Sequence, residues 1–267
     1  MEDIGNIETI NAWYDKGLFH PLQEALFGGS DFANYGLWSE DTTHLRTACE
    51  NMMAALLEQV PGNSASILDV ACGKGESTRF LTRTYAPEQI TAINISEKQL
   101  EATRDKVPGA NILLMDAVEL QFPENSFDTI ICVEAAFHFL TRDKFLAEAL
   151  RVLKPGGRLT LSDILMTQSG EERRRLRHTE NYLPDPQAYH AVMETAGFED
   201  IGIQDVTDRA WRQFFRYVVR FLHDKFLDKE ISREDMEYFL NLHYLLEEEI
   251  THYLLVAGRK PPGAGKT

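Results

Sequence analysis

A short apolar run that ends in a glycine-rich turn constrains this chain more than any other feature. The run SILDVA (66–71) passes directly into Cys72-Gly73-Lys74-Gly75, and Glu76-Ser77-Thr78 then opens a helix. A strand that feeds a helix through glycines brings backbone N–H groups close to a ligand, and open α/β sheets bind ligands at the carboxyl ends of their strands. The turn therefore predicts a strand, a loop and a helix that together hold a small ligand.

Short apolar runs alternate with amphipathic helices after this turn. The expected strands cover 66–71, 89–94, 111–115, 127–133 and 157–165, and the expected helices lie near 76–85, 97–106 and 141–153. Continuous apolar strands separated by helices are typical of a parallel sheet with both faces covered. A helix (184–198), a strand (199–207), two long amphipathic helices (209–228 and 232–247) and a last strand (250–260) follow.

These patterns predict an α/β protein with a Rossmann-like, doubly wound, seven-stranded and mostly parallel sheet. An N-terminal helical arm and a two-helix cap inserted before the last strand complete the expected fold. The predicted parts are the arm or lid (1–62), the cofactor-binding core (63–207), the cap over a substrate pocket (208–248), the last core strand (249–260) and a disordered tail (261–267).

Charge and composition favour a small-molecule ligand. The net charge of −15 disfavours nucleic acid, and the one basic cluster, 172–178, is typical of a solvated helix face. No apolar run approaches the roughly 18 residues of a membrane span, and the acidic N-terminus lacks the features of a secretory signal, so we expect a cytoplasmic protein. The three cysteines show no CxxC spacing, so neither a disulfide framework nor a structural zinc site is expected, and no residue is predicted as a metal ligand.

Two classes of cofactor compete for the glycine turn. A dinucleotide site requires a third glycine where Thr78 stands, and Asp69, four residues before Gly73, would repel a pyrophosphate. The same carboxylate attracts an ammonium or sulfonium group. The electrostatics therefore favour a cation that carries an amino acid, and a dehydrogenase is disfavoured.

The stretch LDVACGKGE (68–76) resembles the first motif of class I S-adenosylmethionine-dependent methyltransferases, which usually have a glycine where Ala71 stands. The resemblance implies that Asp69, Ala71, Gly73 and Gly75 line the methionine part of S-adenosyl-L-methionine. The product of the cofactor would be S-adenosyl-L-homocysteine.

Later segments resemble the remaining motifs of that family in order. Asn94 and Gln99 would contact the ribose, although Asn94 replaces the acid that is common at this position. Asp116 would accept from the adenine amine and the Ala117 N–H would meet a ring nitrogen. LQFPENSFDTIICVEAAFHF, which contains the predicted cofactor residue Glu134, and RVLKPGGRLTLSD resemble the runs through the fourth strand and into the fifth.

The whole pattern resembles small-molecule methyltransferases of the rebeccamycin sugar O-methyltransferase, tocopherol C-methyltransferase and coclaurine N-methyltransferase types. This resemblance implies that His138 is a general base and that Asp163, at the end of the fifth strand, orients it. The alternative is that His138 only packs beside Phe137 and Phe139 and that Asp163 is structural. C- or N-methylation, and binding of the cofactor without methyl transfer, also stay open.

Aromatic residues are expected to close the site. In the related enzymes the N-terminal arm folds over the cofactor, which would place Tyr14, Tyr35 and Trp38 at the site, unless they only anchor the arm. Six aromatic side chains in the first cap helix predict a small-molecule acceptor that is partly apolar or aromatic, if some of them face the pocket; they are Trp211, Phe214, Phe215, Tyr217, Phe221 and Phe226. The sequence makes no prediction of the oligomeric state.

Overall fold

A seven-stranded sheet forms the centre of the protein in the computed structural model, which describes residues 11–12, 15, 18–60, 65–173 and 181–263. Its strands lie in the order β3-β2-β1-β4-β5-β7-β6, and only β7 runs antiparallel to its neighbours. The strands are β1 (Ile67–Val70), β2 (Ile90–Asn94), β3 (Asn111–Leu114), β4 (Phe127–Val133), β5 (Leu153–Met166), β6 (Glu199–Asp205) and β7 (Ile250–Arg259). The predicted doubly wound, mostly parallel sheet is confirmed.

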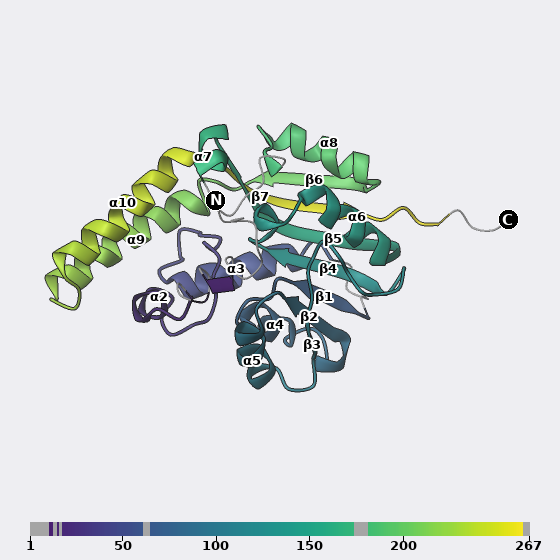
Figure 1. Cartoon of the computed structure of the whole chain (residues 1–267), viewed down its shortest axis with the longest axis horizontal. Helices are drawn as coiled ribbons and strands as arrows, with labels where there is room; N and C mark the ends of the chain where they lie inside the picture. Colours follow the sequence, from purple (N-terminus) through teal and green to yellow (C-terminus); the bar gives the residue numbers. More distant parts are fainter. Residues whose placement is uncertain (1–10, 13–14, 16–17, 61–64, 174–180, 264–267) are drawn as a thin grey trace.

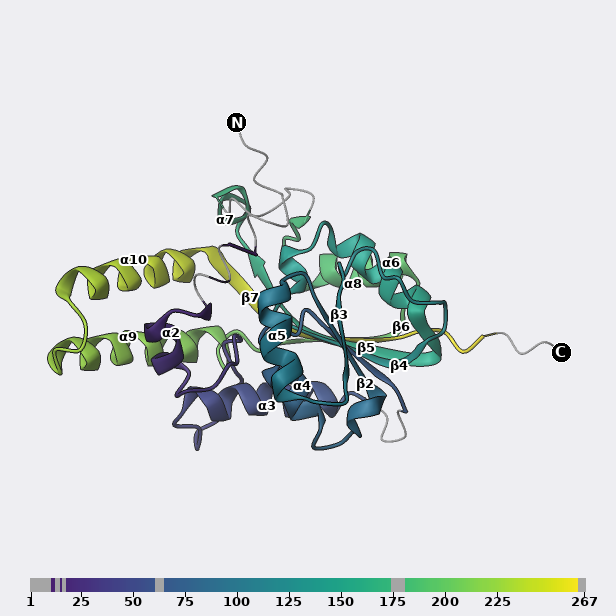
Figure 2. The same ribbon diagram turned by 60° about the horizontal axis from the view of Figure 1, so that its bottom comes forward.

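Helices cover both faces of the sheet (Figure 2). Helices α3 (Leu45–Leu57), α4 (Glu76–Leu81) and α5 (Glu97–Lys106) lie on one face, and α6 (Arg142–Val152) and α8 (Pro186–Ala196) lie on the other. The strands serve both sides because successive side chains point to opposite faces. In β4, for example, Ile131 joins the apolar cluster under α3, whereas Ile130 and Cys132 join the cluster under α6 and α8.

The boundary between α6 and β5 differs from the predicted one. The sequence predicts a helix over 141–153 that stops at a Lys154-Pro155-Gly156-Gly157 turn, with the strand starting at 157. In the structure the helix ends at Val152, and β5 extends from Leu153 to Met166, with an irregularity in its pairing with β4 between Leu153 and Arg158. The backbone of Leu153 pairs with Phe127 of β4, so tertiary pairing extends the strand back through the predicted turn.

Two α-helices inserted between β6 and β7 project away from the sheet as a pair. They are α9 (Trp211–Leu227) and α10 (Arg233–Glu249), and Figure 1 shows the arm helix α2 (Pro21–Leu26) together with α3 beside their base. The structure also contains the short helix α7 (Gln168–Arg173) and the 3₁₀ turns η1 (Pro87–Gln89) and η2 (Ala136–His138).

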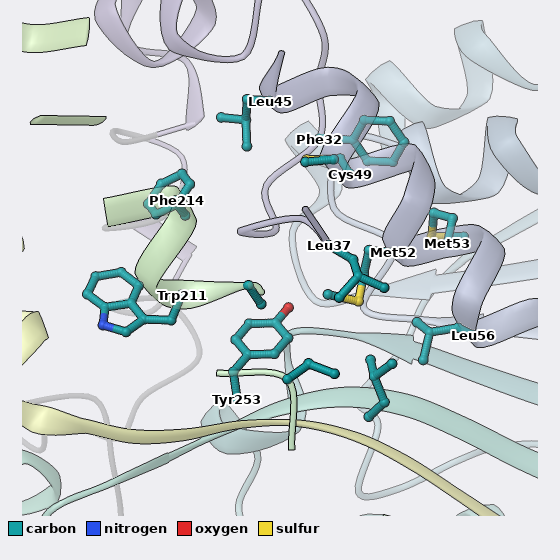
Figure 3. Close-up of a cluster of buried hydrophobic side chains, with 14 of the residues drawn as sticks. Phe32, Leu37, Leu45, Cys49, Met52, Met53, Leu56, Trp211, Phe214 and Tyr253 are labelled. Carbon is teal, nitrogen blue, oxygen red and sulfur yellow. The ribbon is translucent and has the colours of Figure 1, made fainter. Parts of the chain in front are cut away.

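The arm, α3 and α9 share one apolar cluster on the sheet (Figure 3). Trp211 and Phe214 of α9 are almost fully buried in it, at 1% and 3% exposure, opposite Leu37 of the arm and Met52 of α3. Two of the six cap aromatics therefore serve the core, and their packing explains how the arm stays on the sheet.

None of the helices in the described residues combines the length and the apolar composition that a membrane span requires.

Candidate active site

The loops that follow β1, β2 and β4 meet at one edge of the sheet. Val70, the last residue of β1, pairs with Ile93 of β2 on one side and with Cys132 of β4 on the other. Because these strands are parallel, their carboxyl ends and the loops after them lie side by side. Tertiary structure thus gathers at this edge predicted site residues that run along the chain from Asp69 to His138.

Asp69 ties β1 to the start of α4. Its side chain is 1% exposed, and Oδ2 accepts hydrogen bonds from Ser77 Oγ at 2.8 Å and Thr78 Oγ1 at 2.7 Å. Burial raises the pKa of this carboxyl to about 6, against the opposing effect of those two hydrogen bonds. The other oxygen, Oδ1, is buried and has no hydrogen-bond partner among the described residues.

The glycine turn has a left-handed backbone at three alternating positions. Ala71, Gly73 and Gly75 have φ values of 59°, 56° and 81°. A Cβ on Gly75 would lie 2.7 Å from Thr103 Cγ2 and 2.9 Å from Thr103 Cα, so this glycine allows the turn to pack on α5. A Cβ on Gly73 would meet nothing nearer than Gln99 Oε1 at 3.9 Å. Gly73 therefore leaves an open approach to the backbone beside Gln99.

The ends of β2 and β3 bring together the residues predicted for the ribose and the adenine. Asn94 Nδ2 donates to Gln99 Oε1 at 2.8 Å, and the Met115 N–H donates to the Asn94 carbonyl at 3.0 Å. Asp116 Oδ1 accepts from the Val118 N–H at 3.0 Å in a tight turn, inside which Ala117 is buried. Asn94, Gln99, Asp116 and Ala117 thus lie along one rim.

Glu134, predicted to bind the cofactor, holds the arm. Its backbone has a left-handed φ of 51°, directly after β4. Its Oε2 accepts from the Tyr35 N–H of the arm at 2.8 Å and from the Tyr253 hydroxyl of β7 at 2.6 Å. The Tyr35 ring stacks on Phe214 of α9 at 4.4 Å between centroids. Tyr35 therefore fixes the arm both to Glu134 after β4 and to Phe214 of α9.

Other arm residues belong to the same assembly. Trp38 Nε1 donates to the Tyr35 carbonyl at 2.9 Å, and the Trp38 ring packs on Tyr217 of α9 at 5.2 Å. These contacts agree with an anchoring role for Tyr35 and Trp38. Tyr14, the remaining predicted arm residue, lies outside the described residues.

His138 lies in the 3₁₀ turn η2, directly after β4 at the same edge of the sheet. It is half-buried, and its ring lies 4.0 Å from the Phe137 ring between centroids.

Asp163 has partners other than the predicted one. The carboxylate is fully buried; Oδ2 accepts from Arg142 Nε at 2.7 Å and from the Tyr189 hydroxyl at 2.9 Å, and Oδ1 accepts from the Ile164 N–H at 2.9 Å. Both oxygens are thus engaged, and the contacts of Asp163 within the described residues do not include His138. A buried guanidinium takes the carboxylate as its counterion, and the catalytic roles of His138 and Asp163 stay predictions.

Arg142 and Asn181 connect Asp163 to the His138 loop indirectly. Arg142 Nη1 donates to the Asn181 carbonyl at 2.5 Å, and Asn181 Nδ2 donates to the Phe139 carbonyl at 2.7 Å. Neither residue is among those predicted from the sequence. Arg142 could have been found, because a cation in the first turn of a helix opposes the helix dipole and requires an anionic partner.

Comparison with known proteins assigns the family. The family model described as "Methyltransferase domain" matches residues 68–161, which run from β1 into β5. The chain is 31% identical to "O-methyltransferase cnsE" of Penicillium expansum over 198 residues, which cover 68% of this chain and 70% of that protein. The chain belongs to the class I S-adenosylmethionine-dependent methyltransferases.

Two further similarities extend over nearly the whole methyltransferase. It is 29% identical to "27-O-demethylrifamycin SV methyltransferase" of Amycolatopsis mediterranei (strain S699), over 94% of this chain and 97% of that one. The crystal structure of the [4+2]-cyclase SpnF superposes with a TM-score of 0.74 at 23% identity, over 97% of this chain and 98% of that one. The second likeness concerns the fold alone. This protein methylates small molecules, and its cofactor is S-adenosyl-L-methionine.

The site of this methyltransferase fits a cationic cofactor. Asp69 Oδ1 is a buried acceptor without a donor among the described residues, and such an oxygen is costly until a ligand or a proton satisfies it. Gly73 gives open access to the backbone in the same turn. An anionic pyrophosphate would be repelled by the Asp69 carboxylate, whereas an ammonium or sulfonium group is attracted to it.

The described residues contain no group of three or more His, Cys, Asp or Glu side chains suited to a metal ion.

Proposed function

We propose that this methyltransferase transfers a methyl group to a hydroxyl of a small natural product, with His138 as the general base. The position of His138 carries the proposal, because it places an imidazole directly after β4, one strand from the Asp69 loop. The printed names of relatives support the choice of oxygen: one is an O-methyltransferase, and another acts on 27-O-demethylrifamycin SV.

The proposed chemistry is an in-line displacement. When bound, the cofactor supplies an electrophilic methyl group on a sulfonium centre. His138 accepts the proton of the acceptor hydroxyl as its oxygen forms the new bond to carbon, and the electron pair of the broken bond stays on sulfur. Imidazole suits this step because it is a base near neutral pH. Asp69 and the glycine turn hold the donor side, so alignment of the two partners contributes to the rate.

Asp163 supports the His138 loop in this proposal through Arg142 and Asn181, without a contact to His138 itself. Asn181 holds the backbone carbonyl of Phe139, directly after His138, and Arg142 links Asn181 to Asp163. Asp163 therefore acts in the proposal as a positioning residue for the η2 turn. It does not orient the imidazole by a hydrogen bond of its own.

The expected acceptor is apolar over part of its surface. Phe215, Tyr217 and Phe221 of α9 are only partly buried and pack against the apolar cluster that α9 shares with the arm. The Tyr217 ring lies 5.2 Å from the Trp38 ring of the arm between centroids. We propose that α9, α10 and the arm together cover the acceptor and exclude water from the reacting atoms.

The decisive experiment follows an isotopically labelled methyl group. The protein, labelled S-adenosyl-L-methionine and a metabolite extract are incubated, and labelled products are fragmented in a mass spectrometer. Label on oxygen supports the proposal, and label on nitrogen or carbon replaces it with N- or C-methylation. Fold-level neighbours do not decide between these outcomes.

Variants of His138 then test the base with the acceptor so identified. We expect His138→Gln to lower kcat about 10²–10⁴-fold and to remove the acidic limb of the pH profile. His190→Gln, on the exposed side of α8, is the control and keeps full turnover. Unchanged turnover in His138→Gln would contradict a role as base.

A further inference from the structure

The N-terminal arm crosses the end of β2, where the ribose of the cofactor is expected. Asn11 Nδ2 donates to the Ile95 carbonyl at 2.7 Å, directly after β2. Four residues on, Asp15 Oδ1 accepts from Ser96 Oγ at 3.0 Å and from Gln99 Nε2 at 2.8 Å. An acid from the arm thus lies beside one of the two residues predicted to contact the ribose.

The two amide side chains at this position have few acceptor sites left. Asn94 Oδ1 already accepts from the Ile95 N–H at 2.9 Å, and Gln99 Oε1 already accepts from Asn94 Nδ2 at 2.8 Å. A ribose brings two hydroxyl donors, and a carboxylate can accept both whereas an amide oxygen is a weaker acceptor. Asn94 therefore does not supply what an acid would supply at the end of β2.

Asp15 can supply the hydrogen-bond acceptor that an acid at the position of Asn94 would supply. All of its hydrogen bonds within the described part of the chain use Oδ1, which leaves Oδ2 for another donor. Its carboxylate also lies at the N-terminus of α5, where Ser96 caps the helix and the helix dipole favours a negative charge. The carboxylate thus lies next to Gln99, which itself lies beside the open face of Gly73.

We propose that Asp15 completes the ribose site. Its carboxylate accepts a ribose hydroxyl of the cofactor in place of the acid that is absent at Asn94, and Gln99 sets its orientation. Because Asp15 belongs to the arm, binding of the cofactor also holds the arm across the site. Binding of the ribose by Asp15 does not depend on whether the atom that accepts the methyl group is oxygen, nitrogen or carbon.

The test compares ligands that differ only in the ribose. Calorimetry with purified protein measures the Kd of S-adenosyl-L-homocysteine and of its 2′-deoxy and 3′-deoxy analogues. A hydrogen bond to a charged group contributes enough that Asp15→Asn is expected to weaken binding of the intact ligand about 10- to 100-fold. For at least one deoxy analogue the same substitution changes the Kd less than about threefold, because the hydroxyl that Asp15 would bind is gone.

A second arm variant separates a ribose contact from a general effect of the arm. Asp31 lies 2.5 Å from Lys106 Nζ and also pairs with Lys74 of the glycine turn, so Asp31→Asn loosens the arm away from β2. We expect Asp31→Asn to weaken binding of all three ligands by the same factor. If it shows the selectivity expected of Asp15→Asn, or if Asp15→Asn weakens all three equally or not at all, the proposal is overturned.

Folding of the variant is checked within the same experiment. Asp15 is half-buried on the arm, and near wild-type affinity of Asp15→Asn for a deoxy analogue itself demonstrates a folded site. Asp15→Ser is the second variant and is expected to reproduce the same selectivity. Wild-type protein that binds neither donor nor product would instead contradict the cofactor assignment, which keeps the two failures apart.

Discussion

Arg142 Nε donates to Asp163 Oδ2 over 2.7 Å, and both side chains are buried, at 2% and 0% exposure. The pair joins the start of α6 to β5, and Asn181 links Arg142 to the Phe139 carbonyl, directly after the η2 turn that carries His138. A carboxylate that the sequence predicts to serve a histidine is therefore the counterion of a buried guanidinium. This relationship changes what the Asp163→Asn variant is expected to do.

Loss of the Asp163 charge is expected to destabilise the fold. Asp163→Asn leaves the Arg142 guanidinium buried without an anion, and breaking a buried pair in this way costs about 3–5 kcal/mol in the free energy of unfolding. Urea unfolding measures the change. Asp200→Asn is the matched control, because Asp200 pairs with Arg259 at 2.6 Å on the surface and its loss has little effect. A variant as stable as the wild type but without turnover would point to direct action on His138.

The Asp69 carboxyl is expected to make the apo protein less stable as the pH rises. Burial raises its pKa from 3.8 to about 6. The folded state thus keeps a proton that the unfolded state releases near pH 4, so the contribution to stability is present below pH 4 and is lost as the pH rises through about 6. The span corresponds to about 3 kcal/mol.

Asp69→Asn isolates this effect, since the amide does not titrate. We expect the difference in unfolding free energy between variant and wild type to move in favour of the variant by up to about 3 kcal/mol between pH 4 and pH 7. Urea unfolding of both proteins across that range, without cofactor, provides the measurement. A difference that is constant with pH would contradict the raised pKa.

Substitution of Gly75 or Gly73 by alanine is expected to affect stability and cofactor binding to different extents. Gly75→Ala places a Cβ 2.7 Å from Thr103 Cγ2 at a φ of 81°, and overpacking with backbone strain costs about 2–4 kcal/mol. In Gly73→Ala the Cβ meets nothing nearer than Gln99 Oε1 at 3.9 Å, so only the left-handed backbone conformation is unfavourable, at a cost of about 1–2 kcal/mol.

The affinity for S-adenosyl-L-methionine is expected to follow the opposite order: among folded proteins, Gly73→Ala loses more affinity than Gly75→Ala. The Cβ in Gly73→Ala occupies the open approach to the turn, so this variant loses affinity for S-adenosyl-L-methionine while most of its stability remains. Thermal unfolding and calorimetry on each variant give the two quantities. Equal stability losses, or full affinity in Gly73→Ala, would contradict the assigned geometry of the turn.

The Tyr253 hydroxyl is expected to stabilise the arm through Glu134. Tyr253→Phe removes a 2.6 Å hydrogen bond to a carboxylate and leaves Glu134 Oε2 with one donor fewer, which costs about 1.5–3 kcal/mol. Chemical unfolding measures the loss, and limited proteolysis of the arm is expected to become faster. Tyr238→Phe, at a residue 66% exposed on α10, is the control and leaves both unchanged. The prediction fails if the two variants behave alike.

Much of the fold follows from the sequence because each element carries its own local signal. The apolar runs predict the strands, the periodic segments predict α5 and α8–α10, and the glycine turn predicts where a cofactor binds. Class I methyltransferase membership follows from the same short motifs, which the family comparison confirms over residues 68–161. These features depend on neighbours within a few residues, so they can be read without a structure.

The polar pairings depended on tertiary structure. Arg142 meets Asp163 across 21 positions, Tyr35 meets Glu134 across 99, and Asp15 meets Gln99 across 84. No periodicity encodes such contacts, because they arise only when separate loops converge at one edge of the sheet. The cofactor turn is therefore a property of the local sequence, whereas the partner of each buried or bridging charge is decided by how the arm, α6 and the sheet pack together.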